Sequence, residues 1–597
     1  MSTTASRTLL RGALTAGLAA LGLLSTGAPC PAAAAPPADK PAPAATAKPA
    51  DKPAPAAAAK PADKPAPAAA AKPASKPAPI AATPPASKPA PAPARPPRAA
   101  AASPKGAAAP PSDAPIELAI PVERATLQNG LRVVMSPDKS SPTVAVAVTY
   151  DAGSRDEPNG RGGVARLVMG LMARGSRNVA AGEHLRLVAE RGGELHAETE
   201  VDRTTYAETL PANELALALW LEADRMGSLD LSAQAFEAQR RDAQERRGAI
   251  LGAAYGQGGI RLRELVFQGY WPHEHPALGD ADDLAGAELS WARDFHAAHY
   301  GPNRAVLAIA GGFDPGEAME LVRRYFDGIP AVAAAPFKDV PFPEQTSQRT
   351  GVVRDPAARA PAILYGWAVP PLGHPDHHAL SVAAFVLGGG ESSRLEALLV
   401  GDKAVARSVR VAIDRHRGPD LFSIDVRLAE GARVGDVEKL IEGEIRTLAT
   451  AGPPAAELSR ARRQLQSTFV SGLAGASARA RALAEHELLF GDASGLNGEL
   501  ARYFAVTRED VQRAARDHLG PTRRTIVETY PPAIPGAAPP PRASAGARVG
   551  RRAAAPAAPG KGQDKATPAK GPAKARGAAA RPAAKKKPAK TAKPRKK

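Results

Sequence analysis

The chain has 597 residues, one cysteine and a formal net charge of +18. The charge is uneven, because residues 541–597 contain 18 Lys/Arg and one Asp, whereas residues 117–540 carry a net charge of −8. A basic tail attracts polyanions of any kind, so it does not make the folded part a nucleic-acid reader. The single cysteine, Cys30, excludes an intramolecular disulfide and a cysteine-based metal site or nucleophile.

Residues 1–35 have the features of a secretory signal peptide. Arg7 and Arg11 precede an apolar run at residues 13–24, and small residues follow, with a cleavage site at 33–35. The run is shorter than a typical membrane span. We therefore expect secretion across the inner membrane to the periplasm or cell envelope, with no transmembrane segment after cleavage.

Two arms of low complexity flank the middle of the chain. Residues 36–116 and 537–597 consist mostly of Ala, Pro and Lys, and the unit KPADKPAPAAAA occurs twice in the first arm. Such segments cannot bury enough apolar surface to fold, and dense proline favours an extended spacer. We predict that both arms are disordered. The basic tail has no aromatic residue for base stacking, so we expect contact with anionic envelope polymer and no specific nucleic acid.

The folded part begins near residue 124. Residues 126–138 predict two strands around Asn129-Gly130, a dipeptide typical of hairpin turns. Residues 143–154 alternate as a half-buried strand, and 160–178 predict an amphipathic helix that ends at Gly175. The remaining elements of this half are helices at 181–191, 214–226, 232–247 and 315–329, and strands at 192–202, 204–211 and 304–314.

The second half repeats this order. We predict strands at 350–355, 361–370, 408–416, 420–430 and 524–531, and helices at 376–388, 434–450, 456–470, 477–489 and 508–518, with 392–400 between the first helix and the third strand. The repetition indicates an internal duplication. The fold class is therefore α+β, with one domain at 117–335 and a homologous one at 345–535.

Several segments between residues 120 and 535 are distinctive when taken together. They are LQNGLRVV, DAGSRDEPNGRGGVARL, GGELHAETEVDRTTYAETL, LEADRM and LGGGESSRL. With them the chain resembles the pitrilysin/insulinase family of zinc metallopeptidases, especially its mitochondrial-processing-peptidase-like branch. The resemblance implies two pitrilysin-like domains, each a sheet backed by helices, that enclose a peptide.

In that family, the helix after the first strands carries HxxEH. Two histidines at i and i+4 share a zinc, and the glutamate takes a proton from the zinc-bound water. The matching positions in GRGGVARLVMGLM are Arg166, Met169 and Gly170. Arginine has no free lone pair, methionine is not a base and glycine has no side chain. The resemblance thus implies a degenerate site without the family's zinc cofactor.

The family's remaining zinc ligand corresponds to Glu245, and one carboxylate does not hold a catalytic zinc. We also expect the Arg166 guanidinium to pair with Glu245 in place of the metal. The alternative is that both side chains face solvent.

The resemblance marks two further differences. Active members hold their substrate with an Arg and a Tyr seven residues apart, where this chain has Val400 and Arg407. The strand that presents Asn-Ala to the peptide reads His196-Ala197. Three parts of the family's chemistry are therefore altered.

Other polar residues have simpler interpretations. His374 and His378 are spaced i, i+4, but Pro375 and the lack of a neighbouring Glu favour a polar helix start. His273 and His275 are interpreted as loop packing.

Two further motifs also have structural explanations. The glycines at 388–390 lack a following Lys-Ser/Thr, so they indicate a helix-ending turn and not a phosphate cradle. Glu222 and Asp224 are expected to pair with nearby arginines.

Three functions remain open. The first is a peptide-binding pseudopeptidase that pairs, as a heterodimer, with an active pitrilysin-like subunit. The second is a zinc metalloendopeptidase with a rearranged site built from Glu245 and histidines such as His196. The third is an envelope-tethered scaffold whose arms bind anionic polymer.

Overall fold

The computed structural model describes residues 114–333 and 340–532. The predicted signal peptide and most of both predicted arms lie outside these residues. No helix in the described part is long and apolar enough to cross a membrane.

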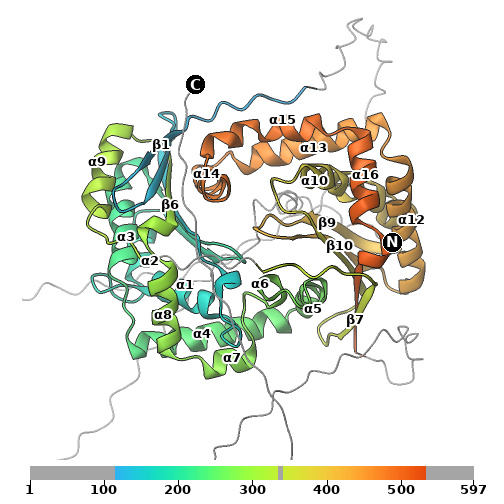
Figure 1. Cartoon of the computed structure of the whole chain (residues 1–597), viewed down its shortest axis with the longest axis horizontal. Helices are drawn as coiled ribbons and strands as arrows, with labels where there is room; N and C mark the ends of the chain where they lie inside the picture. Colours follow the sequence, from blue (N-terminus) through green and yellow to red (C-terminus); the bar gives the residue numbers. More distant parts are fainter. Residues whose placement is uncertain (1–113, 334–339, 533–597) are drawn as a thin grey trace, which may run out of the picture. The chain divides into compact units, whose positions relative to one another are not determined.

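The first half forms one six-stranded sheet and the helices around it (Figure 1). Its strands follow the order β1-β2-β6-β3-β5-β4, and all neighbours are antiparallel except β2 and β6. The strands are β1 Glu123–Thr126, β2 Arg132–Pro137, β3 Thr143–Tyr150, β4 Glu194–Thr199, β5 Thr204–Pro211 and β6 Ala305–Gly311. The helices are α1 Val164–Arg174, α2 Glu183–Glu190, α3 Leu215–Gly227, α4 Ala233–Gly252, α5 Gly256–Val266, α6 Trp271–Glu274, α7 Ala281–Gly286, α8 Leu289–His299 and α9 Pro315–Phe326.

The second half forms a five-stranded sheet in the order β7-β11-β8-β10-β9, in which only β7 and β11 run parallel among the described strands. The strands are β7 Arg349–Arg354, β8 Ala362–Val369, β9 Ala406–Ile413, β10 Asp420–Leu428 and β11 Thr525–Tyr530. The helices are α10 Pro375–Gly388, α11 Arg394–Glu396, α12 Val434–Ala451, α13 Ala455–Gly472, α14 Ala476–Phe490, α15 Glu499–Ala505 and α16 Arg508–His518.

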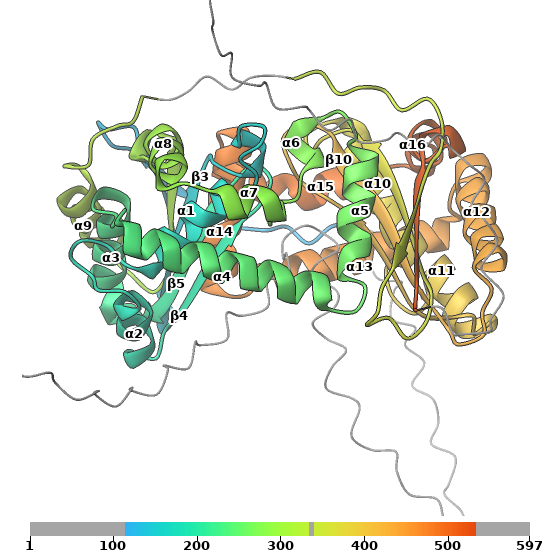
Figure 2. The same cartoon turned by 90° about the horizontal axis from the view of Figure 1, so that it is seen from below.

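Each sheet is covered on one face by a helix from the other half. Helix α14 packs on β3, β5 and β6 of the first sheet, whereas α5, which follows the long α4, packs on β7, β8 and β11 of the second (Figure 2). As a result, one core cluster contains Ala147 and Ala308 of the first half together with Leu483 of α14. Because apolar burial is the main source of stability, the exchange makes each half depend on the other.

The elements predicted from sequence are present in the predicted order. The turn at Asn129-Gly130 joins β1 and β2, with Gly130 at φ +87, a value that favours glycine. Helix α4 continues to Gly252 instead of ending at Arg247. Helices α5, α8 and α15 were not predicted from the sequence.

Candidate functional site

Helix α1 is anchored at its amino terminus by a buried carboxylate. Glu157 accepts hydrogen bonds from the backbone N–H groups of Gly163 and Ala165, both at 2.8 Å. The ring of His275 lies 3.0 Å from this carboxylate and stacks on Trp271. The N–H groups of a first helical turn have no intrahelical partner, so these bonds fix the start of α1. The predicted packing role of His275 is confirmed.

Arg166, Met169 and Gly170 are all half-buried and lie on one side of α1. Residues three and four apart share a helical face, so their spacing brings them together. The opposite side is fully buried, and the hydroxyl of Tyr206 donates to the carbonyl oxygen of Met169 at 2.9 Å. The helix thus presents the motif positions on one face, without a metal-ligating side chain among them.

The side chain of Gln239, on α4, occupies the space next to Gly170. A Cβ atom built on Gly170 would lie 1.9 Å from Nε2 of Gln239. The amide therefore stands where a histidine at position 170 would have to pass. Gln239 was not predicted as a site residue. No sequence motif marks it, because its position depends on how α4 packs against α1.

This contact predicts a coupling between the two residues. Alanine is favoured over glycine inside a helix by about 0.5–1 kcal/mol. We expect Gly170→Ala to raise the free energy of unfolding by about this amount in a Gln239→Ala background. In the wild-type background the gain should be smaller, because the Gln239 amide must move. Denaturant unfolding of the four chains measures the difference, and equal gains in both backgrounds would disprove the contact.

Glu245 is an exposed residue of α4. Ala243 is a buried residue of α4, and Glu245, two residues further on, lies about 200° round the helix and is exposed. No ion pair between Arg166 and Glu245 occurs among the described residues, so the predicted pairing is wrong. The α4 residues that meet α1 include Gln239, next to Gly170, and Asp242, whose carboxylate accepts a hydrogen bond from Arg174 at 3.1 Å.

The two residues of β4 point to opposite faces of the sheet. His196 is in register with Ala207, whose side chain packs in the cluster that contains α14. Ala197 is in register with Tyr206, on the face that α1 covers. The His196 ring, 3.2 Å from Glu198, therefore faces away from α1, and the structure does not assemble the rearranged zinc site from Glu245 and His196.

The second-half positions also lack the chemistry of the family pair. Val400 lies in a π-helix, Ala397–Asp402, and packs partly against the core. Arg407, at the start of β9, is exposed, and it lacks the phenol hydroxyl that a tyrosine would offer at this position. Between them, Ala404 has φ +50, a conformation that costs a residue with a Cβ roughly 1–2 kcal/mol.

Replacing Ala404 by glycine is therefore expected to raise the free energy of unfolding by up to about 1 kcal/mol, because glycine adopts positive φ without a steric penalty. Ala456→Gly, at an exposed helical position of α13, is the matched control and should lower stability by a similar amount. A loss of stability in both variants, measured by urea unfolding, would refute the strain at Ala404.

The residues at 374–378 begin a helix, as predicted, but two of the histidines are not surface groups. His374 caps α10 by accepting a hydrogen bond from the backbone of Asp376 at 3.1 Å. His377 and His378 are buried, and His378 lies 3.3 Å from a carboxylate oxygen of Glu499. No neighbouring Glu was visible in the sequence because this one comes from α15.

The interpretation of residues 222–224 is half right. Glu222 pairs with Arg225, with 3.0 Å between Oε1 and Nη1. Asp224 instead accepts hydrogen bonds from Ser176 and Asn178, not from an arginine. These bonds tie the end of α3 to the segment after α1.

The remaining two predictions concern His273 and the glycines at 388–390. His273 is buried as predicted, with Nε2 3.1 Å from the carbonyl oxygen of Arg417, but it lies in the short helix α6 and not in a loop. Helix α10 ends at Gly388 and is followed by Gly389 and Gly390, as expected of a helix-ending turn.

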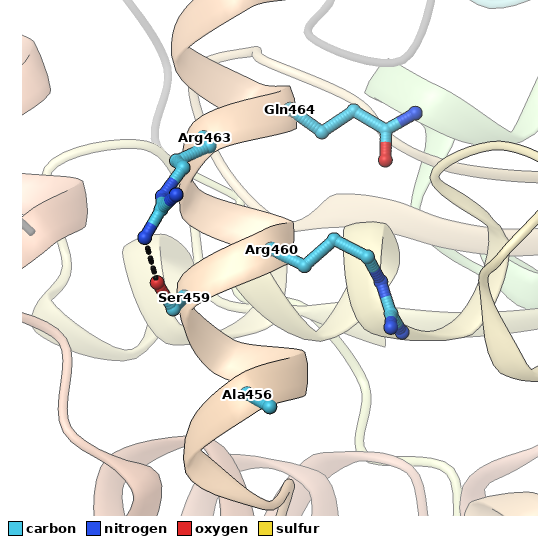
Figure 3. Close-up of a pocket in the computed structure, with 5 residues that line it drawn as sticks. All are labelled: Ala456, Ser459, Arg460, Arg463 and Gln464. Carbon is cyan, nitrogen blue, oxygen red and sulfur yellow. Dashed lines mark hydrogen bonds between the residues drawn. The ribbon is translucent and has the colours of Figure 1, made fainter. Parts of the chain in front are cut away.

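A pocket of about 520 Å³ lies on one side of α13 (Figure 3). It is lined by Ala456, Ser459, Arg460, Arg463 and Gln464. Arg463 donates a hydrogen bond to the Ser459 hydroxyl at 2.9 Å. Because the lining contains no histidine and no carboxylate, the pocket offers no acid–base pair and no metal ligands of the zinc type.

The α1 face does not fit the catalytic zinc of an HxxEH enzyme. Its three motif positions contribute no imidazole and no carboxylate, and Glu245 alone, an exposed residue of α4, would leave the metal with one protein ligand. A catalytic zinc needs about three protein ligands.

Two family models match the chain. One is described as insulinase (peptidase family M16) and matches residues 132–253, and the other, described as the peptidase M16 inactive domain, matches residues 292–465. Both halves of the chain are therefore similar to the insulinase (M16) peptidase family, and the predicted pitrilysin-like α+β fold is confirmed.

Individual proteins agree with this. The chain is 28% identical over 421 residues to the zinc protease PqqE of Helicobacter pylori, covering 68% of this chain and 93% of that protein. It is 26% identical over 416 residues to a probable mitochondrial-processing peptidase subunit beta of Arabidopsis thaliana, covering 66% and 75%. The crystal structure of a protease from Helicobacter pylori has a TM-score of 0.66 at 27% identity, over 69% of this chain and all of that one.

Proposed function

We propose that this chain is a non-catalytic M16 homologue that binds peptides and serves as the partner of an active zinc peptidase subunit. The observation that carries the proposal is the face of α1, where Arg166, Met169 and Gly170 stand at the positions of HxxEH. A guanidinium, a thioether and a bare backbone neither hold zinc nor activate water. The nearby Gln239 amide fills space that the second histidine would need.

An edge strand supports peptide binding. Among the described strands β4 pairs only with β5, so its other edge keeps free backbone N–H and C=O groups. An extended peptide can add to such an edge through main-chain hydrogen bonds. This mode of binding needs no metal and survives the loss of the HxxEH residues.

A partner would supply the missing chemistry. The Arabidopsis relative is named as a subunit, which supports a heterodimer for this chain as well. The altered positions Val400 and Arg407 lie in the second half, so we assign substrate positioning in the pair to the active subunit.

We further propose that the pair works in the periplasm or cell envelope, where the basic tail contacts anionic polymer. The support is the leader at residues 1–35 and the charge of residues 541–597. Cell fractionation with sequencing of the mature amino terminus checks this, and an intact leader on cytoplasmic protein would contradict it.

Co-purification tests the proposed function. A tagged full-length chain, isolated from envelope extracts of its source, should bring down an M16 subunit that carries HxxEH. The pair should hydrolyse a peptide that this chain alone leaves intact. Hydrolysis by the chain alone would overturn the proposal, and recovery of envelope polymer with no peptidase would favour the scaffold instead.

A further inference from the structure

A compact polar cluster is buried between α2, α3 and β5. The exposed fractions are 3% for His184, 0% for Glu208 and 0% for Glu222. One ligand-type atom from each residue lies within 4.8 Å of the other two. The cluster shares a sheet face with α1, but the ring of Tyr206 stands between them, because its hydroxyl bonds to Met169 and Arg225 lies over its face at 4.3 Å.

The charges in this cluster do not balance without a further cation. Arg225 contacts both carboxylates, with Nη1 3.0 Å from Glu222 and Nη2 3.4 Å from Glu208. Two carboxylates and one guanidinium do not balance in a buried environment, where an isolated charge is costly. A proton or a metal ion bound within the cluster would supply the missing positive charge.

Several atoms of the cluster have coordination capacity left. Oε2 of Glu222 and Oε2 of Glu208 are buried and accept no hydrogen bond, and Oε1 of Glu222 has only the ion pair with Arg225. Native proteins seldom leave buried polar atoms unpaired, so each such atom suggests a missing ion or water. The ring nitrogen Nε2 of His184 contacts Oε1 of Glu208, so the imidazole lies within reach of the same ion.

We propose that His184, Glu208 and Glu222 form a buried site for a divalent cation of the zinc class. One imidazole and two carboxylates suit this class of metal. Tetrahedral metal–ligand bonds of about 2.0–2.2 Å place the ligand atoms roughly 3.3–3.6 Å apart, so the three side chains must close around the ion. Binding fixes α2 and α3 to the sheet, because the three ligands come from α2, α3 and β5.

Arg225 is the competitor of the metal. Its Nη2 lies 2.8 Å from Nε2 of His184, the ring nitrogen next to Glu208. The guanidinium must withdraw when the metal enters. Removing the Arg225 guanidinium takes away one positive charge and the group that occupies the site. The remaining ligands should therefore hold the metal more tightly.

Zinc retention by the full-length chain tests the site. After removal of metal with a chelator and incubation with Zn²⁺, the wild type should retain one equivalent through gel filtration, measured by elemental analysis. Glu222→Gln and His184→Gln should each lose at least tenfold in affinity, and Arg225→Met should gain at least tenfold. Glu245→Gln and His196→Gln, outside the cluster, are the controls and should retain zinc as the wild type does.

A wild-type chain that retains no zinc overturns the inference even if the ligand variants fail to fold. So does equal retention in the wild type and the two ligand variants, or loss in a control. The result is independent of the proposed function, because this cluster is not on the α1 face. Zinc found in the purified chain must therefore be assigned to a site before it is taken as evidence of peptidase activity.

Discussion

Replacing Arg203 by methionine is expected to lower the free energy of unfolding by about 3–5 kcal/mol. The Arg203 side chain is buried and pairs with Glu200, with Asp202 at 3.1 Å and with Glu485 at 3.6 Å. Glu485 lies on α14, so this one guanidinium joins the β4–β5 turn to the helix that the second half contributes. Without it, buried carboxylates lose the cation they share.

The loss should depend on pH in a defined direction. Burial raises the pKa of Glu200 to about 7 even though Arg203 attracts the charged form. In the variant this pKa rises further above its unfolded value. A carboxyl group whose pKa is raised in the folded state destabilises that state at pH values above its unfolded pKa. The penalty disappears at lower pH, where the group is protonated in both states. The deficit relative to wild type should be greatest near pH 8 and shrink towards pH 5.

Arg186→Met is the matched control for this prediction. Arg186 pairs with Glu183 and Glu190 on the exposed surface of α2. Exposed pairs contribute about 0–1 kcal/mol, so this variant should unfold almost as the wild type does. If urea unfolding shows the same loss for both variants, the buried cluster does not hold the two halves together.

Rebuilding the family motif should create a zinc site that the wild type lacks. The variant R166H/M169E/G170H supplies two imidazoles on one face of α1, and Q239E adds a carboxylate from the α4 residue that lies beside position 170. We expect the quadruple variant to bind one more equivalent of Zn²⁺ than the wild type. With Q239A in place of Q239E the affinity should fall at least tenfold, or about 1.4 kcal/mol, because one ligand is missing.

The same series decides which residue of α4 faces the site. Glu245 remains in both versions, and its exposed position predicts that E245Q has no effect on zinc binding in either. If E245Q abolishes binding while Q239A and Q239E behave alike, then Glu245 is the ligand and α4 turns that residue, not Gln239, towards α1.

Local features of the fold were predictable because local residues determine them. Asn129-Gly130 encodes the turn between β1 and β2, and Gly175 ends α1, as the C-cap of that helix. The i, i+3, i+4 spacing of Arg166, Met169 and Gly170 requires a shared face on any helix.

The long-range contacts were not predictable from such patterns. Nothing in the sequence of α14 shows that it covers the sheet of the other half, because an apolar helix face does not specify its partner. Likewise Glu245 matches a family position in spacing, yet the α4 side chain that stands next to Gly170 is Gln239. The carboxylate partner of His378 comes from α15, more than a hundred residues away.

The central claim is that the α1 face cannot hold and activate a zinc-bound water. Peptide hydrolysis by the purified full-length chain, measured with and without a chelator and free of other proteases, tests it most directly. We expect the chain to show no chelator-sensitive peptide hydrolysis, whether or not zinc is present in the buried cluster. Hydrolysis that stops with the chelator, returns with Zn²⁺ and persists in the Glu222→Gln variant would contradict it.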